Sequence, residues 1–181
     1  MSQELDVLNM VTRRLADANI PYMVTGSMAM NYYAVPRMTR DIDIVVELAE
    51  GDASHAVQIF QKDFYIDPEM VQDAVKNTSM FNIIHNDYII KVDLIIRKAH
   101  EYRCTEFSRK RCIEIDGHPC NIVSPEDLIL SKLEWAKESH SEMQLRDVRN
   151  LLTSVKDLDR EYLTKWAHDL GVKDLYEEVL Q

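Results

Sequence analysis

Residues 24–46 constrain this chain most strongly, because they place two aspartates on a strand that is otherwise apolar. Asp41 and Asp43 are separated by Ile42, and residues two apart in a strand point to the same face. The opposite face is apolar and belongs to a core. The Cα atoms of two such aspartates lie about 7 Å apart, so their carboxylates repel each other unless a cation neutralises them. The pattern predicts a metal site, while the commoner meaning of such a pair by itself is a solvated strand face.

A glycine and a serine stand near the start of the same segment, between a short strand expected at 22–25 and a short helix expected from Ser27. Gly26 has no Cβ, so another group can approach its backbone closely. Ser27 can cap the helix, and the free N–H groups of a first helical turn attract anions. By itself such a pair is most often a plain turn and cap. Together with the aspartates that follow it in the sequence, the pair predicts a site for a metal-bound polyphosphate. Arg40 is expected to be at most a loop contact of that site.

The composition is that of an ordinary soluble globular protein. The chain has 181 residues, enough for one domain with or without a small appendage, and 46% of them are apolar. The net charge of −10 argues against general nucleic-acid binding and allows only a local basic surface. Three cysteines without a CxxC spacing indicate reduced thiols in a cytoplasmic protein. We expect no signal peptide, because the N-terminus has no basic n-region and apolar h-region. We also expect no membrane span, because no apolar run approaches about 18 residues.

The hydrophobic periodicity predicts an α+β protein. Strands are expected at 22–25, from Asp41, and at 79–85, 88–97, 112–115 and 119–123, and helices at 3–18, 52–64, 68–76, 125–139, 142–154, 159–169 and 172–180. The pattern becomes purely helical at Ser124-Pro125, a strong helix start with serine as cap and proline in the first turn. We therefore divide the chain into a core at 1–123 and a helical subdomain at 124–181 that packs on it. Both tryptophans are expected to pack in the core or between helices.

The apolar strand expected at 88–97 carries one more aspartate. Asp93 and Lys91 share a face of this strand, and the opposite face is apolar throughout. A simple ion pair between the two on an exposed face is one explanation. The other is that strand pairing brings Asp93 beside Asp41 and Asp43 as a third carboxylate. Lys91 would then partly neutralise the cluster or contact a phosphate.

Five residues of these motifs, taken as a set, resemble the nucleotidyltransferase superfamily typified by DNA polymerase β: Gly26, Ser27, Asp41, Asp43 and Asp93. The resemblance implies a nucleotidyltransferase-like mixed sheet flanked by helices. It also implies an enzyme that moves a nucleoside monophosphate from an NTP to an acceptor hydroxyl and releases pyrophosphate. Asp41, Asp43 and Asp93 would be catalytic and hold Mg²⁺ or Mn²⁺, and Asp93 could also act as the base for the acceptor hydroxyl. Gly26 and Ser27 would bind the NTP phosphates.

Motifs further along the chain are similar to those of the AbiEii/AbiGii toxin-like branch of that superfamily. They are KVDL at 91–94, Lys132 and Arg146-Asp147, so the similarity spans residues 20–150. On this basis Lys91, Lys132 and Asp147 are candidate nucleotide contacts, although such residues also form ordinary ion pairs. Two other classes of protein stay open as alternatives to an enzyme. One is a non-catalytic nucleotidyltransferase-fold binding module of a toxin–antitoxin type system, with a protein partner. The other is a structural protein with a plain cation site.

Residues 97–111 form a basic segment directly after the strand that bears Asp93. The segment holds six of the 21 lysines and arginines of the chain. A solvated helix face explains it most simply. A polyanionic acceptor would also need a local positive surface, because phosphate contacts supply most non-specific affinity. On this ground we expect RNA as the acceptor, with Arg109 and Lys110 among its contacts, while a small molecule and a protein side chain stay open.

Overall fold

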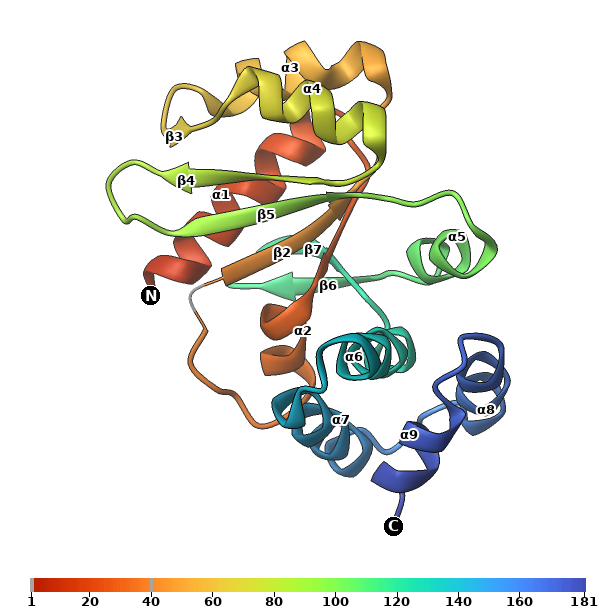
Figure 1. Ribbon diagram of the computed structural model, residues 1–181. Helices are drawn as coiled ribbons and strands as arrows, with labels where there is room; N and C mark the ends of the chain where they lie inside the picture. The colour runs from red at the N-terminus through yellow and green to blue at the C-terminus, as the bar shows by residue number, and fades with distance from the viewer. Residues whose placement is uncertain (1, 40) are drawn as a thin grey trace.

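The computed structural model describes residues 2–39 and 41–181, so the contact expected of Arg40 lies outside the described residues. Helices and a mixed sheet make up an α+β fold, as the sequence predicts (Figure 1). The strands are β1 (Tyr22–Thr25), β2 (Asp41–Val46), β3 (Phe64–Tyr65), β4 (Met80–His85), β5 (Lys91–Ile96), β6 (Arg111–Ile115) and β7 (His118–Ile122). They form one sheet in the order β3-β4-β5-β2-β1-β7-β6.

The helices cover both sides of this sheet. They are α1 (Gln3–Asp17), α2 (Gly26–Tyr33), the 3-10 turn η1 (Glu50–Asp52), α3 (Ala53–Phe60), α4 (Pro68–Asn77), α5 (Glu101–Ser108), α6 (Pro125–Ser139), α7 (Glu142–Ser154), α8 (Arg160–Asp169) and α9 (Lys173–Val179). Figure 1 shows α6 to α9 gathered away from α3 and α4, and α2 contacts β2 as well as α6 and α7. Within the described residues, no helix combines the length and the apolar character that crossing a membrane requires.

Strand β2 fixes the register around the predicted carboxylates. It pairs antiparallel with β1 and parallel with β5, which sets Asp43 beside Asp93 and Asp41 beside Lys91. Ile42 lies fully buried on the opposite face. The predicted alternation of β2, acidic on one face and apolar on the other, is therefore confirmed. Because parallel partners run side by side, residues far apart in the sequence meet on one face of the sheet.

The start of α6 follows the capping signal of the sequence. The backbone N–H of Asp127 donates to the hydroxyl of Ser124 at 3.1 Å, and Pro125 is the first residue of the helix. Proline suits this position because the first N–H groups of a helix have no partner within it. The start of the helical segment is thus confirmed, while its status as a separate subdomain at 124–181 stays a prediction.

Two predicted boundaries are wrong for local reasons. The strand predicted at 88–97 begins only at Lys91, because Ile89 has a φ of +54° and the preceding residues form a turn. The N–H groups of Asp87 and Tyr88 both point to Nδ1 of His85, which holds that turn. The helix predicted at 52–64 ends at Phe60, and Phe64 begins the short edge strand β3 instead.

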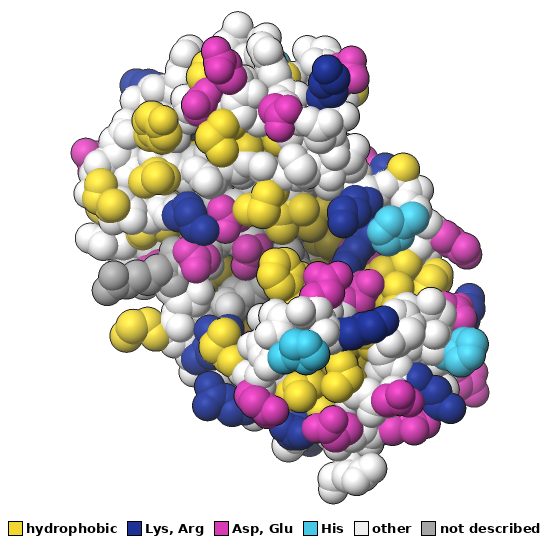
Figure 2. Space-filling view, in the orientation of Figure 1, with side chains coloured by type: hydrophobic (Ala, Val, Ile, Leu, Met, Phe, Trp, Pro, Cys, Tyr) yellow, Lys and Arg dark blue, Asp and Glu magenta, His cyan; other side chains and the backbone are white. Residues whose placement is uncertain are grey.

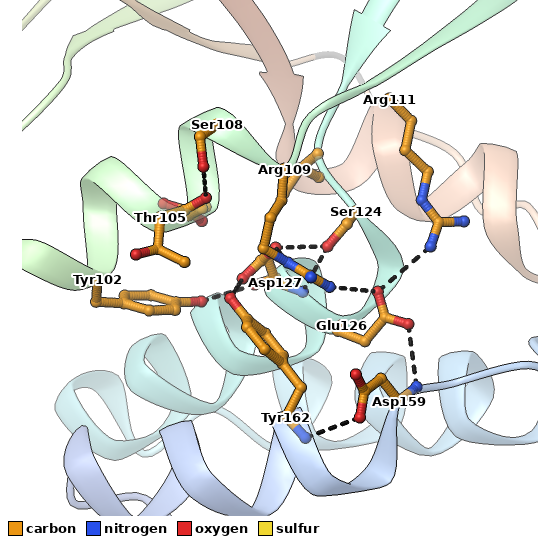
Figure 3. Close-up of polar contacts among 12 residues, drawn as sticks. Tyr102, Thr105, Ser108, Arg109, Arg111, Ser124, Glu126, Asp127, Asp159 and Tyr162 are labelled. Carbon is orange, nitrogen blue, oxygen red and sulfur yellow. Dashed lines mark hydrogen bonds and ion pairs between the residues drawn. The ribbon is translucent and has the colours of Figure 1, made fainter.

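A buried polar cluster joins α5, α6 and α8 (Figure 3). Asp127 is fully buried, and its carboxylate accepts hydrogen bonds from the hydroxyls of Ser124 at 2.5 Å and Tyr162 at 2.6 Å. Arg109, just after α5, donates from Nε to the same carboxylate at 3.1 Å. Its guanidinium lies 3.9 Å from the centroid of the Tyr162 ring. Arg109 is therefore the cation that balances the charge of a carboxylate taken out of water.

Replacing Arg109 by alanine should lower the free energy of unfolding by about 3 kcal/mol, because the buried Asp127 carboxylate loses its cation. Arg149→Ala is the matched control, since Arg149 pairs with Glu178 at the surface, 3.5 Å apart. Such exposed pairs contribute at most about 1 kcal/mol. Urea unfolding of both variants measures the difference, and equally small losses would show that Asp127 does not depend on Arg109.

Candidate active site

The three aspartates predicted as a cluster lie on neighbouring strands of the sheet. Asp43 on β2 stands directly opposite Asp93 on β5, and Asp41 stands one step along the same face. Asp93 is 7% exposed, Asp43 is half-buried and Asp41 is exposed. The structure therefore places Asp93 beside Asp41 and Asp43 through strand pairing, with the deepest carboxylate on β5.

Lys91 lies against two of these carboxylates. Its Nζ is 2.8 Å from Oδ2 of Asp93 and 3.7 Å from Oδ1 of Asp41. The hydrogen bond to Asp93 raises the pKa of Lys91, so the ammonium stays charged. The other oxygen of Asp93, Oδ1, is buried and has no hydrogen-bond partner among the described residues. A buried carboxylate oxygen without a donor is costly, and this one is available to a ligand.

Gly26 explains how the turn at the start of α2 comes into contact with the carboxylates. Its φ is +62°, a conformation that glycine adopts without strain. A Cβ at this position would overlap the carboxylate of Asp43, so only glycine fits. Burial, followed by the charges of Asp93 and Asp41, raises the pKa of Asp43. The folded protein thus holds Asp43 where its ionised form is disfavoured unless a cation is near.

Ser27 has a different role from the predicted one. Helix α2 begins at Gly26, and Thr25 stands at the capping position without a side-chain hydrogen bond. The hydroxyl of Ser27 instead accepts a hydrogen bond from Nη2 of Arg37 at 2.7 Å. The prediction that Ser27 caps the helix is therefore wrong. Because no described side chain caps α2, the N–H groups of its first turn keep their capacity to bind an anion.

Asp147 binds two cations near the first turn of α2, Arg37 and Lys132. Its carboxylate accepts from Nη2 of Arg37 at 3.1 Å and from Nζ of Lys132 at 2.8 Å. Gln144 accepts a further hydrogen bond from Lys132 at 3.0 Å. Burial acts to raise the pKa of Asp147, but the hydrogen bonds from Arg37 and Lys132 outweigh it and hold the pKa below its usual value. Asp147 is fully buried and bound to Arg37 and Lys132, and its predicted role as a nucleotide contact stays a prediction.

Sequence reasoning missed Arg37, although a signal was present. Arg37, Thr39, Asp41 and Asp43 follow one another at intervals of two residues. This spacing puts side chains on one face whenever the backbone is extended. All four line the same cavity in the structure. The contact with Asp147 bridges 110 residues, which no local pattern could indicate.

A cavity of about 310 Å³ separates the carboxylate face of the sheet from α6 and α7. Its wall includes Thr25, Gly26, Ser27, Arg37, Thr39, Asp41, Asp43, Asp93, Ile95, Leu128, Ser131, Lys132, Trp135, Met143 and Gln144. Figure 2 shows acidic and hydrophobic side chains gathered in the hollow between the sheet and the helical part. Trp166 is buried as expected, but Trp135 is 59% exposed at this cavity, so its predicted packing role is wrong.

The predicted metal ligands fit a divalent cation in chemistry but do not converge as a finished site. Within residues 2–39 and 41–181, no group of three His, Cys, Asp or Glu side chains has the arrangement of a metal site. Lys91 lies between two of the predicted ligands, with its ammonium near both Asp41 and Asp93. Asp43 and Asp93 still offer adjacent carboxylates, one with an unpaired buried oxygen. Carboxylate oxygens of this kind are the ligands that Mg²⁺ and Mn²⁺ prefer.

The arginines of the basic segment at 97–111 do not form an open positive surface. Arg97 pairs with Glu47, Arg103 with Glu106 and Glu134, Arg109 with Asp127 and Glu126, and Arg111 with Glu126. The arginines are therefore neutralised within the fold, and Arg109 supports a buried carboxylate. The expectation that Arg109 contacts RNA loses its basis, since a side chain committed to an internal pair is not free to bind phosphate.

The comparisons with known proteins identify the fold. The chain matches no protein-family model and no curated protein sequence. The solution structure of the antibiotic-resistance factor ANT(2'')-Ia is similar, with a TM-score of 0.61 and 16% identity over 96% of this chain and 94% of that chain. A nucleotidyltransferase-like protein from Paracoccidioides brasiliensis gives 0.58 and 18% identity, over 98% and 93% of the two chains. The lincosamide adenylyltransferase LnuA gives 0.54 and 11%, over 86% and 99%.

These similarities show that the chain has the nucleotidyltransferase fold. The sequence-based expectation of a nucleotidyltransferase-like mixed sheet flanked by helices is therefore confirmed. The resemblance to the AbiEii/AbiGii branch stays a prediction, and so do the roles of the individual site residues.

Replacing Gly26 by alanine should destabilise the protein more than the same change at Gly117. The φ angles are +62° and +77°, so alanine strains the backbone at both positions, by about 1 kcal/mol. At Gly117 the new methyl group meets open space, whereas at Gly26 it meets Asp43. We expect a further loss of about 2 kcal/mol at Gly26 from overpacking, measured by urea unfolding. Equal losses at the two glycines would contradict the packing of Asp43 on Gly26.

Asp43→Asn should stabilise the metal-free protein at neutral pH. Because the folded pKa of Asp43 is raised, its carboxyl costs stability progressively as the pH rises from the unfolded pKa through the folded pKa, and asparagine removes this penalty. The gain should disappear below the unfolded pKa of about 3.9. Melting temperatures across this pH range, measured in EDTA, check the prediction, with Asp87→Asn on an exposed turn as control. A loss of stability at neutral pH in Asp43→Asn would contradict it.

Proposed function

We propose that this protein is a metal-dependent nucleotidyltransferase that moves a nucleoside monophosphate from an NTP to an acceptor hydroxyl and releases pyrophosphate. One observation carries the proposal. The carboxylate of Asp43, which faces Asp93, packs directly on Gly26 at the first turn of α2. An acidic cluster and an anion-binding helix start therefore touch, which is the arrangement that a metal-bound polyphosphate requires. A structural cation site would explain the acidic cluster but not the anion-binding helix start beside it.

The phosphate side of the cavity carries its own positive charge. The N–H groups of the first turn of α2 are not capped by a described side chain, and Lys132 lines the cavity wall. Arg37 lines the wall as well and is fixed by Ser27 and Asp147. Helix starts, arginine and lysine all bind phosphate oxygens. In this proposal they hold the β- and γ-phosphates and stabilise the pyrophosphate as it leaves.

The acidic side would hold the metal and orient the acceptor. Asp43 and Asp93, joined by Asp41, would ligate Mg²⁺ or Mn²⁺, while Lys91 neutralises part of the remaining charge. A bound divalent ion supplies charge neutralisation for the phosphates and favours the ionised acceptor oxygen. Asp93 then has the position of the base, because it lies deepest in the cluster and one of its oxygens has no hydrogen-bond partner among the described residues.

The proposed step balances simply. The acceptor oxygen forms a bond to the α-phosphorus of the NTP, and the bond between that phosphorus and the α–β bridging oxygen breaks. Pyrophosphate leaves with the electron pair of the broken bond. The proton of the acceptor hydroxyl passes to the carboxylate of Asp93, which general-base catalysis allows when the two groups are within hydrogen-bond reach.

A small molecule is the acceptor that the observations favour. The arginines of the basic segment are paired internally, so the support for RNA is withdrawn. Similar structures include an enzyme crystallised with adenylyl-2''-tobramycin and a lincomycin-bound lincosamide adenylyltransferase. We therefore place a hydroxyl-bearing small molecule before RNA. The non-catalytic toxin–antitoxin module gains no support, because the site keeps its full set of carboxylates.

The test follows two labels of one NTP. The protein is incubated with Mg²⁺, a cell extract separated into RNA and small-molecule fractions, and each of the four NTPs in turn, labelled at the α- or the γ-phosphate. Nucleotidyl transfer attaches the α-label to a component of one fraction and releases the γ-label as pyrophosphate. Attachment of the γ-label would instead indicate a phosphotransferase, and attachment of neither label across all four NTPs would reject the proposal.

Asp93→Asn should separate binding from turnover. The variant keeps Asp41 and Asp43 for the metal-bound NTP, so the Mg²⁺·NTP-induced rise in melting temperature should stay near that of the wild type. Transfer should fall by about 100-fold or more, because a general base typically contributes 10²–10⁴-fold. Asp87→Asn, on the exposed turn before β5, should change neither quantity. If Asp93→Asn lost NTP binding and transfer to the same extent, Asp93 would serve NTP binding as well and not only the acceptor hydroxyl.

A further inference from the structure

Trp135 is placed where a large aromatic side chain gains little from the fold. It is 59% exposed on α6, whereas Trp166 is 7% exposed and packs on Tyr102. Trp135 lines the 310 Å³ cavity that holds the carboxylates. It also lines a second cavity of about 250 Å³, which shares Thr25, Ile95 and Ser131 with the first. The ring therefore stands at the junction of one continuous cleft.

We propose that Trp135 is the platform on which the nucleobase of the NTP stacks, with Met143 beside it on the same wall. Met143 is 46% exposed at the start of α7 and lines the same cavity. Thioether and indole groups both make favourable contacts with aromatic rings. The inference rests on the proposed function, because it assigns the base subsite of the same NTP.

The position of Lys132, a cation proposed to bind the phosphates, favours the nucleobase over other groups as the occupant of the surface at Trp135. Lys132 precedes Trp135 by three residues on α6, so the two lie about one helical turn apart. The hydrogen bond from Lys132 to Gln144 ties the start of α7, and with it Met143, to that turn. Trp135 and Met143 thus form an apolar surface beside the cationic end of the cavity. In an NTP only the ribose separates the base from the phosphates, so its ring reaches such a surface.

The polar groups that precede Trp135 on α6 indicate little selection among the bases. Ser131, one helical turn earlier, donates its hydroxyl to Glu106 at 2.7 Å and accepts from Arg103 at 2.7 Å. Arg103 is also bound to Glu134 at 2.7 Å. These polar groups are occupied within the fold and are not free to read the edge of a base. Stacking alone tolerates any base, because each has a π-face, so we expect little discrimination among the four NTPs.

Fluorescence of Trp135 tests the stacking directly. Trp166→Phe leaves Trp135 as the only tryptophan of the chain. This variant is titrated with each of the four NTPs in Ca²⁺, and with inorganic tripolyphosphate, which carries the phosphates without a base. The expected result is quenching by all four NTPs and none by tripolyphosphate. Equal quenching by tripolyphosphate would overturn the proposal, because the signal would then not come from a ring on Trp135.

Binding measurements in the otherwise native chain avoid dependence on the Trp166 replacement. Trp135→Ala should weaken NTP binding about tenfold, the usual contribution of one stacked base, and leave the affinity for tripolyphosphate unchanged. Trp135→Phe should restore most of the loss, since it keeps an aromatic face. Tyr65→Ala, at another exposed aromatic residue on β3, is the control and should have no effect.

The outcomes separate this inference from the proposed function. NTP binding that Trp135→Ala does not weaken overturns the base subsite and leaves the nucleotidyltransferase proposal standing. In that case a loss confined to the transfer step would assign Trp135 to the acceptor, in the second cavity. Absence of NTP binding to the native protein would overturn both proposals.

Discussion

The in-register parallel pairing of β2 with β5 is the constraint on which the rest of the site depends. It sets Asp43 against Asp93 on one face of the sheet, where two partly buried like charges repel each other. Lys91 relieves part of that repulsion from the same strand as Asp93. Gly26 gives Asp43 the space that any other residue would fill. Among the described residues the acidic cluster thus carries more negative charge than Lys91 balances, which suits the metal ion of the proposed function.

Asp147 imposes the second constraint, because it holds two cations from different parts of the chain. Arg37 comes from the segment before β2 and Lys132 from α6, and both bind the buried carboxylate of Asp147 on α7. The helical part therefore does more than cover the sheet, since Lys132 on α6 and Asp147 on α7 build the positive wall together with Arg37. A site with its aspartates on the strands, and with its cations on α6 and on the segment before β2, suits a polyphosphate carried by a metal ion.

Periodicity and capping signals in the sequence predicted the parts of the fold that depend on local rules. The alternation around Asp41 and Asp43 and the start of α6 at Ser124-Pro125 are read from neighbouring residues, and both are confirmed. Arg37 and the exposed Trp135 were missed because their surroundings come from segments distant in the sequence. The basic segment at 97–111 was misread for the same reason, since the acids that neutralise it lie mostly on α6.

The most direct test of this account is a crystal structure with Mn²⁺ and a non-hydrolysable NTP analogue, in which anomalous scattering locates the metal. The account predicts Mn²⁺ in contact with the carboxylates of Asp43 and Asp93, and the triphosphate against the first turn of α2. A metal bound elsewhere on the chain, or a triphosphate that does not contact Gly26 and Ser27, would contradict it.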